Sequence, residues 1–294
     1  MSDYGEVYGT YENGVKCTVI TGVRNFDVGK IFDCGQAFRF NPVPGRKNGW
    51  EGVAFGRYIS VRQNGNEVTI VNSDAADFRN IWKDYFALDE NYADYDADIV
   101  SRSDVPALSQ AVKSGCGIRI LRQDPWEALC SFIISQNNNI PRIKSLINRL
   151  CRECGKEIIC SDGRTMYSFP DAAAVASLGE EALKAMKTGF RAGYIQNAAE
   201  CVADGRMSLD GVSACVTADA SRLLQTLRGV GPKVAACVLL FGFGKLDAFP
   251  VDVWIKKVIA KYFPGDFSPE KLGPYAGIAQ QYLFYYERQL GANW

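Results

Sequence analysis

Apolar and polar residues alternate along the first quarter of the chain, as they do in half-buried strands. Residues 50–62 contain apolar side chains at alternating positions, namely Val53 and Phe55, then Ile59 and Val61. The run Gln-Asn-Gly-Asn at 63–66 is a strong tight-turn signal, and residues 68–71 are typical of a returning strand. The pattern therefore predicts an antiparallel hairpin here, and strands and turns throughout residues 1–75.

Beyond residue 74 the apolar spacing becomes helical. Residues 74–88 predict a helix, residues 89–98 are acidic, rich in tyrosine and typical of turns, and helices dominate from about residue 105. Asp124 and Pro125 are a good helix start, because aspartate caps a helix and proline suits its first turn. That helix is expected to end at the polar run 136–139. Further helices are expected at 141–154, 170–176, 180–187, 191–202, 219–227, 232–242, 251–262 and 273–289.

These elements predict an α+β protein of two domains, which suits a chain of 294 residues. We expect a β-rich N-terminal domain with an antiparallel sheet at residues 1–120, packed on an all-helical region at residues 121–294.

Composition is that of an ordinary globular protein, with a formal net charge of zero. Residues 1–120 hold 13 Lys and Arg against 16 Asp and Glu, whereas residues 121–294 hold 20 against 17. This weak asymmetry permits a local basic face on the second half. No apolar run approaches the roughly 18 residues of a membrane span, and the N-terminus resembles no secretion signal, so a cytoplasmic location is expected.

The chain has ten cysteines and no histidine. The lack of histidine excludes Ser-His and Cys-His catalysis and every histidine metal site. The cysteines are scattered, as expected of reduced thiols in apolar positions, and we predict no metal site.

The motif Leu227-Arg-Gly-Val-Gly-Pro-Lys233 predicts a tight hairpin that opens into an apolar helix. Gly229 and Gly231 can take positive φ and let another backbone approach closely. The free amides and the positive end of the helix dipole would bind a phosphate without reading sequence. An ordinary helix–turn–helix connection is the alternative, but the full spacing favours DNA binding.

Lys233 falls in the first turn of that helix, and Asp252 follows it nineteen residues later in an apolar segment. The positive helix end disfavours a charged lysine and favours a neutral, nucleophilic amine. A nearby aspartate could stabilise a developing sugar cation, besides capping the next helix. The simpler interpretation is a surface lysine and a helix cap.

With these residues the chain resembles the 8-oxoguanine DNA glycosylases of the helix-hairpin-helix superfamily. The resemblance covers most of the chain and lies in separate blocks at 33–39, 118–125, 135–142, 189–191, 229–237, 250–253 and 275–284. The hairpin and the aspartate are shared by the superfamily. The Gly-Gln, Asn-Asn-Asn and Ala-Gln-Gln-Tyr-Leu-Phe runs are typical of the oxoguanine branch.

The resemblance implies a role for each matching position. Lys233 would be the nucleophile that forms a Schiff base, and Asp252 its assisting carboxylate. The carbonyl of Gly35 would accept the N7 hydrogen that guanine lacks, and Gln280 would read the Watson–Crick edge of the base. The base would lie between Cys237 and Phe284. The remaining positions would contact DNA: Asn137 filling the vacated stack, Phe190 as the wedge, and Arg142 and Arg191 at the orphaned cytosine.

The implied function is excision of 8-oxoguanine from duplex DNA followed by strand nicking, by a monomer that needs no organic cofactor. A cation at the hairpin carbonyls would be structural. Three positions depart from the family pattern: Phe190 replaces tyrosine, Trp254 replaces histidine and Arg228 replaces proline. Two alternatives are a glycosylase for other damaged bases and a non-catalytic DNA-binding or damage-sensing protein.

Overall fold

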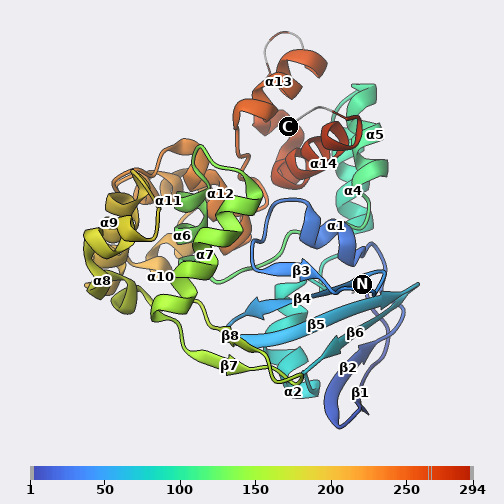
Figure 1. Ribbon diagram of the computed structural model, residues 1–294. Helices are drawn as coiled ribbons and strands as arrows, with labels where there is room; N and C mark the ends of the chain where they lie inside the picture. The colour runs from blue at the N-terminus through green and yellow to red at the C-terminus, as the bar shows by residue number, and fades with distance from the viewer. Residues whose placement is uncertain (1–2, 264, 266, 292–294) are drawn as a thin grey trace.

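The computed structural model describes residues 3–263, 265 and 267–291. An antiparallel sheet with strand order β1-β2-β6-β5-β4-β3 forms the lower right of the view in Figure 1. Its strands are β1 (Val7–Glu12), β2 (Val15–Ile20), β3 (Phe40–Pro42), β4 (Gly49–Ala54), β5 (Arg57–Asn64) and β6 (Glu67–Val71). The predicted β-rich N-terminal region is therefore confirmed.

The predicted hairpin is present, but it is longer than the sequence suggested. Its turn lies at Gly65 and Asn66, between β5 and β6, where Asn64 pairs with Glu67. Residues 50–62 were expected to form one strand, and this is wrong: they divide into β4 and β5 around Phe55 and Gly56. Both turn residues have positive φ, 49° and 69°. Phe55 is an unusual turn residue, and its ring packs edge-on against Tyr85.

Helices follow and flank the sheet. In the N-terminal half they are α1 (Val28–Asp33), α2 (Ala75–Asp77), the π-helical turn η1 (Phe78–Trp82), α3 (Lys83–Tyr85), α4 (Tyr92–Ser101) and α5 (Pro106–Gly115). In the C-terminal half they are α6 (Pro125–Ser135), α7 (Ile140–Cys154), α8 (Ala172–Ala185), α9 (Arg191–Ala203), α10 (Leu209–Ala214), α11 (Thr217–Leu224), α12 (Pro232–Phe243), α13 (Val253–Tyr262), the 3₁₀ helix η2 (Pro269–Tyr275) and α14 (Ala276–Gln289).

The start of α6 is as predicted, because the Asp124 carboxylate accepts a hydrogen bond from the Glu127 amide at 2.9 Å. The turn expected at 89–98 is wrong. This segment forms most of α4, which buries Tyr92 and Ile99 and leaves Asp94 exposed. The all-helical description of residues 121–294 also needs correction, since β7 (Glu157–Ile159) and β8 (Thr165–Tyr167) form a small hairpin there.

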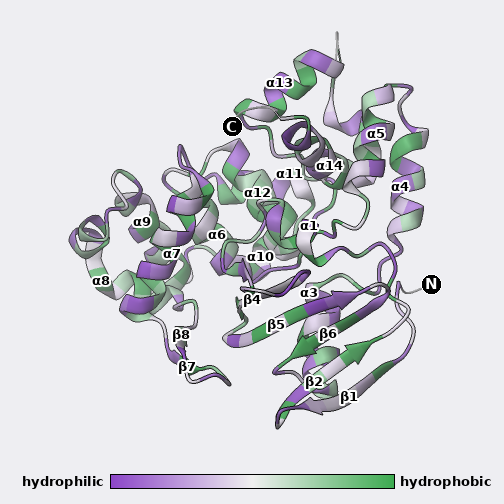
Figure 2. Cartoon of the chain, turned by 45° about the vertical axis from the view of Figure 1, so that its right-hand side comes forward, coloured by the Kyte–Doolittle hydropathy of each residue, from purple (hydrophilic) through white to green (hydrophobic). Residues whose placement is uncertain are grey.

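Two hydrophobic cores meet at the loop that follows α1. One core fills the space beneath the six-stranded sheet, and Figure 2 shows the apolar and polar residues alternating along the strands. The other core lies among the helices and includes Cys34 and Phe38 from the N-terminal half. The loop is thus inserted into the helical core, which fixes its position relative to α14. No helix of the described residues is long and apolar enough to cross a membrane.

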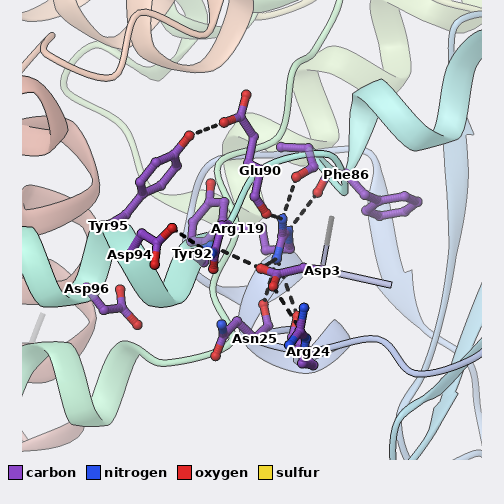
Figure 3. Close-up of polar contacts among 12 residues, drawn as sticks. Asp3, Arg24, Asn25, Phe86, Glu90, Tyr92, Asp94, Tyr95, Asp96 and Arg119 are labelled. Atoms are coloured by element: carbon purple, nitrogen blue, oxygen red, sulfur yellow. Dashed lines mark hydrogen bonds and ion pairs between the residues drawn. The ribbon is translucent and has the colours of Figure 1, made fainter. Parts of the chain in front are cut away.

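Arg119 ties the chain's N-terminus to the segment between α3 and α4. Its guanidinium is fully buried, pairs with the Asp3 carboxylate at 2.9 Å and lies 4.2 Å from the centre of the Tyr92 ring. Further donors reach backbone carbonyls, including those of Phe86 at 2.9 Å and Glu90 at 3.0 Å (Figure 3). A buried ion pair whose donors are satisfied in this way leaves an uncompensated charge when one partner is lost.

Replacing Arg119 by methionine should therefore lower the free energy of unfolding by about 3–5 kcal/mol, because the Asp3 carboxylate would stay buried without its partner. Denaturant unfolding measures this change. The control is Arg206→Met, which removes an exposed ion pair to Asp204 and should cost at most about 1 kcal/mol. Equal effects of the two substitutions would contradict a special role for the buried pair.

Candidate active site

The hairpin before α12 leaves backbone amides free. Gly229 has φ of +81°, and a Cβ placed there would lie 2.2 Å from the Tyr194 ring. Gly231 was expected to need positive φ too, but its φ is −96° and nothing lies within 4 Å of a Cβ built on it. Glycine at position 231 therefore leaves open space beside the backbone, and its ability to take positive φ is not used. No side chain caps α12, so its first amides and its positive dipole end face outward.

Lys233 is the second residue of α12 and is half-buried. Its Nζ lies 5.6 Å from the centre of the Phe132 ring on α6. The neighbouring thiol is that of Cys237, one turn further along the same face. Burial raises the pKa of the Cys237 thiol, Lys233 lowers it, and Asp252 raises it again. The amine, the thiol and the carboxylate therefore lie near one another.

Asp252 caps α13 with only one of its two carboxylate oxygens. One carboxylate oxygen accepts hydrogen bonds from the amides of Trp254 at 3.0 Å and Ile255 at 2.8 Å. Among the described residues no donor reaches the other oxygen, and Asp252 forms no direct ion pair with Lys233. The two groups can thus act on a molecule between them.

Gly35 lies at the end of α1, in the loop inserted between the two halves. Its φ is +82°, and a Cβ built there would lie 3.8 Å from Phe284 on α14 and 3.9 Å from Ile140 on α7. The absence of a side chain keeps this space open. The Gly35 carbonyl accepts no hydrogen bond from a described residue, whereas the carbonyls of Cys34 and Gln36 each accept one from a glutamine amide.

Gln280 carries a buried polar atom that lacks a hydrogen-bond partner within the described part of the chain. It is 5% exposed, yet its Oε1 has no hydrogen-bond partner among the described residues. A buried acceptor without a donor costs about 1–3 kcal/mol. Such a cost is typical of a group that waits for a ligand. Phe284 follows one turn later on the same face of α14 and is half-buried.

The polar loop after α6 holds the residues expected to contact DNA. Asn137 is exposed with φ of +46°, and Arg142 is exposed near the start of α7. Arg191 differs, since it is 3% exposed and donates to the carbonyls of Gln136 at 2.8 Å and Asn137 at 2.9 Å. It holds the Asn137 loop in place. Both burial and the charge of Arg142 lower the pKa of Arg191, so the two arginines are close.

Phe190 begins α9 as an exposed aromatic ring. It is 56% exposed, and its ring is stacked by the Arg191 guanidinium at 4.4 Å. Tyr194 packs edge-on against it at 5.9 Å and also fills the space beside Gly229. The ring expected to act as a wedge is therefore joined through Tyr194 to the hairpin that is expected to bind a phosphate.

Family models match almost the whole of this arrangement. Residues 18–129 match the N-terminal domain of 8-oxoguanine DNA glycosylase, and residues 130–272 match the HhH-GPD superfamily of base excision DNA repair proteins. The chain belongs to the 8-oxoguanine DNA glycosylase family. The resemblance inferred from the sequence is thereby confirmed.

Relatives in this family match from about half to nearly all of the chain. A structure of the Clostridium acetobutylicum 8-oxoguanine glycosylase/lyase, in complex with double-stranded DNA containing cytosine opposite 8-oxoguanine, is 35% identical. It superimposes with a TM-score of 0.90 over 98% of this chain and 99% of that one. A probable N-glycosylase/DNA lyase of Methanothermobacter thermautotrophicus is 32% identical over 63% of this chain and 68% of its own length. The Saccharomyces cerevisiae N-glycosylase/DNA lyase is 39% identical over 48% and 41%.

Other members of the superfamily share the fold alone. The 3-methyladenine DNA glycosylase of Archaeoglobus fulgidus has a TM-score of 0.71 at 18% identity. Within the described residues no group of three or more His, Cys, Asp or Glu side chains could hold a metal ion, and all ten cysteines are free.

Several residues near the site were not singled out by the sequence. Phe132 beneath the amine looks like plain core, and Tyr194 beside the hairpin looks like an ordinary helix residue. Gln36, Gln123 and Gln281 hold the Gly35 loop, and each lies in a block that resembles the family, but no role was inferred for them from the sequence. A glutamine on an otherwise apolar helix face was the available signal for Gln281.

The two hairpin glycines should respond differently to alanine. Gly229→Ala combines positive φ with a clash against Tyr194, so it should lower the free energy of unfolding by well over 1 kcal/mol. Gly231→Ala meets neither obstacle and should change it by no more than about 0.5 kcal/mol. Thermal unfolding of both variants measures this. A larger loss for Gly231→Ala would show that the hairpin geometry is described wrongly.

Proposed function

We propose that this protein is a bifunctional DNA glycosylase/AP lyase that excises 8-oxoguanine from duplex DNA, with Lys233 as its nucleophile. The observation that supports it best is the setting of Lys233. The amine lies at the unprotected start of α12, against the Phe132 ring and beside Cys237 and Asp252. A lysine amine can form a Schiff base with a sugar, and the unused oxygen of Asp252 can stabilise a cationic sugar.

The proposed chemistry has two steps. In the first, the Lys233 nitrogen forms a bond to C1′ of the damaged nucleotide while the C1′–N9 bond breaks, and the base leaves with that electron pair and a proton. Opening of the sugar ring gives an imine between Lys233 and C1′. In the second, loss of a proton from C2′ expels the 3′ phosphate by β-elimination, which nicks the strand. Both steps need an extrahelical nucleotide, because the amine cannot reach C1′ inside the stack.

Lesion reading is assigned to the two unpartnered acceptors. The Oε1 of Gln280 would accept a hydrogen from the Watson–Crick edge of the base. The Gly35 carbonyl would accept the N7 hydrogen of 8-oxoguanine, whereas guanine has a lone pair at that atom. One hydrogen bond gained against one lone-pair clash amounts to a few kcal/mol of discrimination. Cys237 and Phe284 would cover the two faces of the ring.

DNA backbone and opposite-base contacts are assigned to the hairpin, to three exposed side chains and to Arg191, which is 3% exposed. The hairpin of Gly229 and Gly231 would bind a phosphate through its free amides. Asn137 and Phe190 are exposed and would fill and wedge the vacated stack, while Arg142 and Arg191 would face the orphaned cytosine. We expect a monomer acting in the cell interior, where its DNA substrate lies. It would need no organic cofactor, and any cation at the hairpin carbonyls would be structural.

Lys233→Gln tests the proposed nucleophile. It should abolish the borohydride-trapped adduct between protein and 8-oxoguanine duplex, because the amide cannot form an imine, while duplex binding persists. The control is Lys184→Gln, since Lys184 is paired with Glu181 on α8 and its loss should leave trapping unchanged. Undiminished trapping by Lys233→Gln would remove Lys233 from its assigned role.

Gln280→Ala tests the reading of the base. It should slow 8-oxoguanine excision by roughly tenfold to hundredfold, because a hydrogen bond to the bound base is lost. Strand cleavage at a preformed abasic site should persist, since no base is read there. Single-turnover cleavage assays on both duplexes measure this. Excision at the wild-type rate would show that the base is read elsewhere.

A further inference from the structure

Three consecutive carbonyls in the loop after α1 differ in the hydrogen bonds that they accept from the rest of the protein. The Cys34 carbonyl accepts a hydrogen bond from the Gln281 side-chain amide at 2.6 Å. The Gln36 carbonyl accepts one from the Gln123 side-chain amide at 2.8 Å. The Gly35 carbonyl between them accepts none from a described residue. The two flanking carbonyls are thus held, and the middle one is left for a ligand.

Gln281 makes its contact across the largest distance in sequence. It is 3% exposed, 247 positions from Cys34, and directly follows Gln280 on α14. Its hydrogen bond joins the segment at Gly35 to the helix turn that carries Gln280. A buried amide that donates at this distance is strongly constrained. Movement of α14 would therefore carry the loop with it.

The other contacts of the loop hold its ends. The Gln36 side chain donates to the carbonyls of Ile31 and Arg119, both at 2.9 Å, and accepts from the Leu121 amide at 2.9 Å. At the other end, Arg288 pairs with the Asp33 carboxylate at 2.6 Å. These bonds fix the loop on the protein, but none of them reaches the turn of α14 that carries Gln280.

We propose that Gln281 is a positioning residue that sets lesion recognition, by holding the Gly35 carbonyl at a fixed place opposite Gln280. This inference rests on the proposed function. Discrimination between guanine and 8-oxoguanine depends on where one carbonyl points, and a displacement of about 1 Å can cost on the order of a hundredfold in rate. A bond that joins the two reading groups keeps that displacement small.

The Cys34 thiol is not an alternative explanation for the contact. It is 1% exposed, and burial raises its pKa to about 12, so it stays protonated and unreactive. The Gln281 amide donates to the Cys34 carbonyl at 2.6 Å, and its nearness to the sulfur only partly offsets the effect of burial on the pKa of the thiol.

The test compares two reactions of the full-length protein. Gln281→Met keeps the length of the side chain and removes the donor. Single-turnover excision from an 8-oxoguanine:cytosine duplex should fall tenfold or more. Cleavage of a preformed abasic site opposite cytosine should change less than twofold, and so should the Kd for the abasic duplex. Equal loss in both reactions, or no loss in either, would overturn the proposal.

Two further variants guard against a general effect on the helix or the fold. Tyr286→Phe removes a hydrogen bond between α14 and Gln110 of α5, away from the loop, and should leave both rates within twofold. Gln123→Met releases the Gln36 carbonyl on the other side of Gly35 and should reproduce the selective loss of excision. It serves as the test if Gln281→Met does not fold. A selective loss in Tyr286→Phe, or its absence in Gln123→Met, would contradict the assignment.

Gln281→Glu adds a pH profile that a purely structural role would not give. A protonated glutamic acid can donate to the Cys34 carbonyl, whereas the carboxylate repels it. Excision relative to wild type at the same pH should therefore rise as pH falls, while relative abasic-site cleavage stays flat. A flat ratio for both reactions would contradict the proposal. If wild-type protein itself excised no 8-oxoguanine, the proposed function would fail instead, which separates the two outcomes.

Discussion

The contact between the loop after α1 and helix α14 is the constraint on which the candidate site depends. The loop belongs to the N-terminal half of the chain, but Cys34 and Phe38 are part of the helical core. Hydrogen bonds from Gln281 and Arg288 hold it to α14. Because the loop supplies Gly35 and α14 supplies Gln280 and Phe284, the candidate site lies where the two halves meet. The base reading that we propose needs residues from both halves.

Lys233 and Cys237 lie on a second helix, α12, whose position is fixed by packing. Helix α12 approaches α6 closely, since a Cβ at Gly242 would lie 2.9 Å from that of Ala128, and the rings of Phe132 and Phe241 stack at 5.4 Å. Helix α14 approaches α12 closely as well, because a Cβ at Gly277 would lie 2.5 Å from a Leu240 side-chain carbon. Because these helices pack without spare volume, Lys233 has a fixed position relative to Gly35 and Gln280.

Local signals predicted the elements that are decided locally. Gly65 marks the β5–β6 turn, and Asp124 with Pro125 marks the start of α6. The signals failed where tertiary contacts decide: Phe55 takes positive φ in a turn because its ring packs on Tyr85. Helix α4 forms despite its acidic sequence because Tyr92 and Ile99 are buried. The order of motifs revealed the family, but contacts such as Gln281 with Cys34 have no local signal.

The central claim is that the Lys233 amine becomes bonded to the sugar, and peptide mapping of the borohydride-reduced complex tests it most directly. After nuclease treatment and trypsin digestion, mass spectrometry should find the deoxyribose remnant on Lys233. Trypsin would not cleave after the modified lysine, so the remnant should lie on one peptide running from Gly229 to Lys245. A remnant on another lysine or on the N-terminal amine would contradict the account.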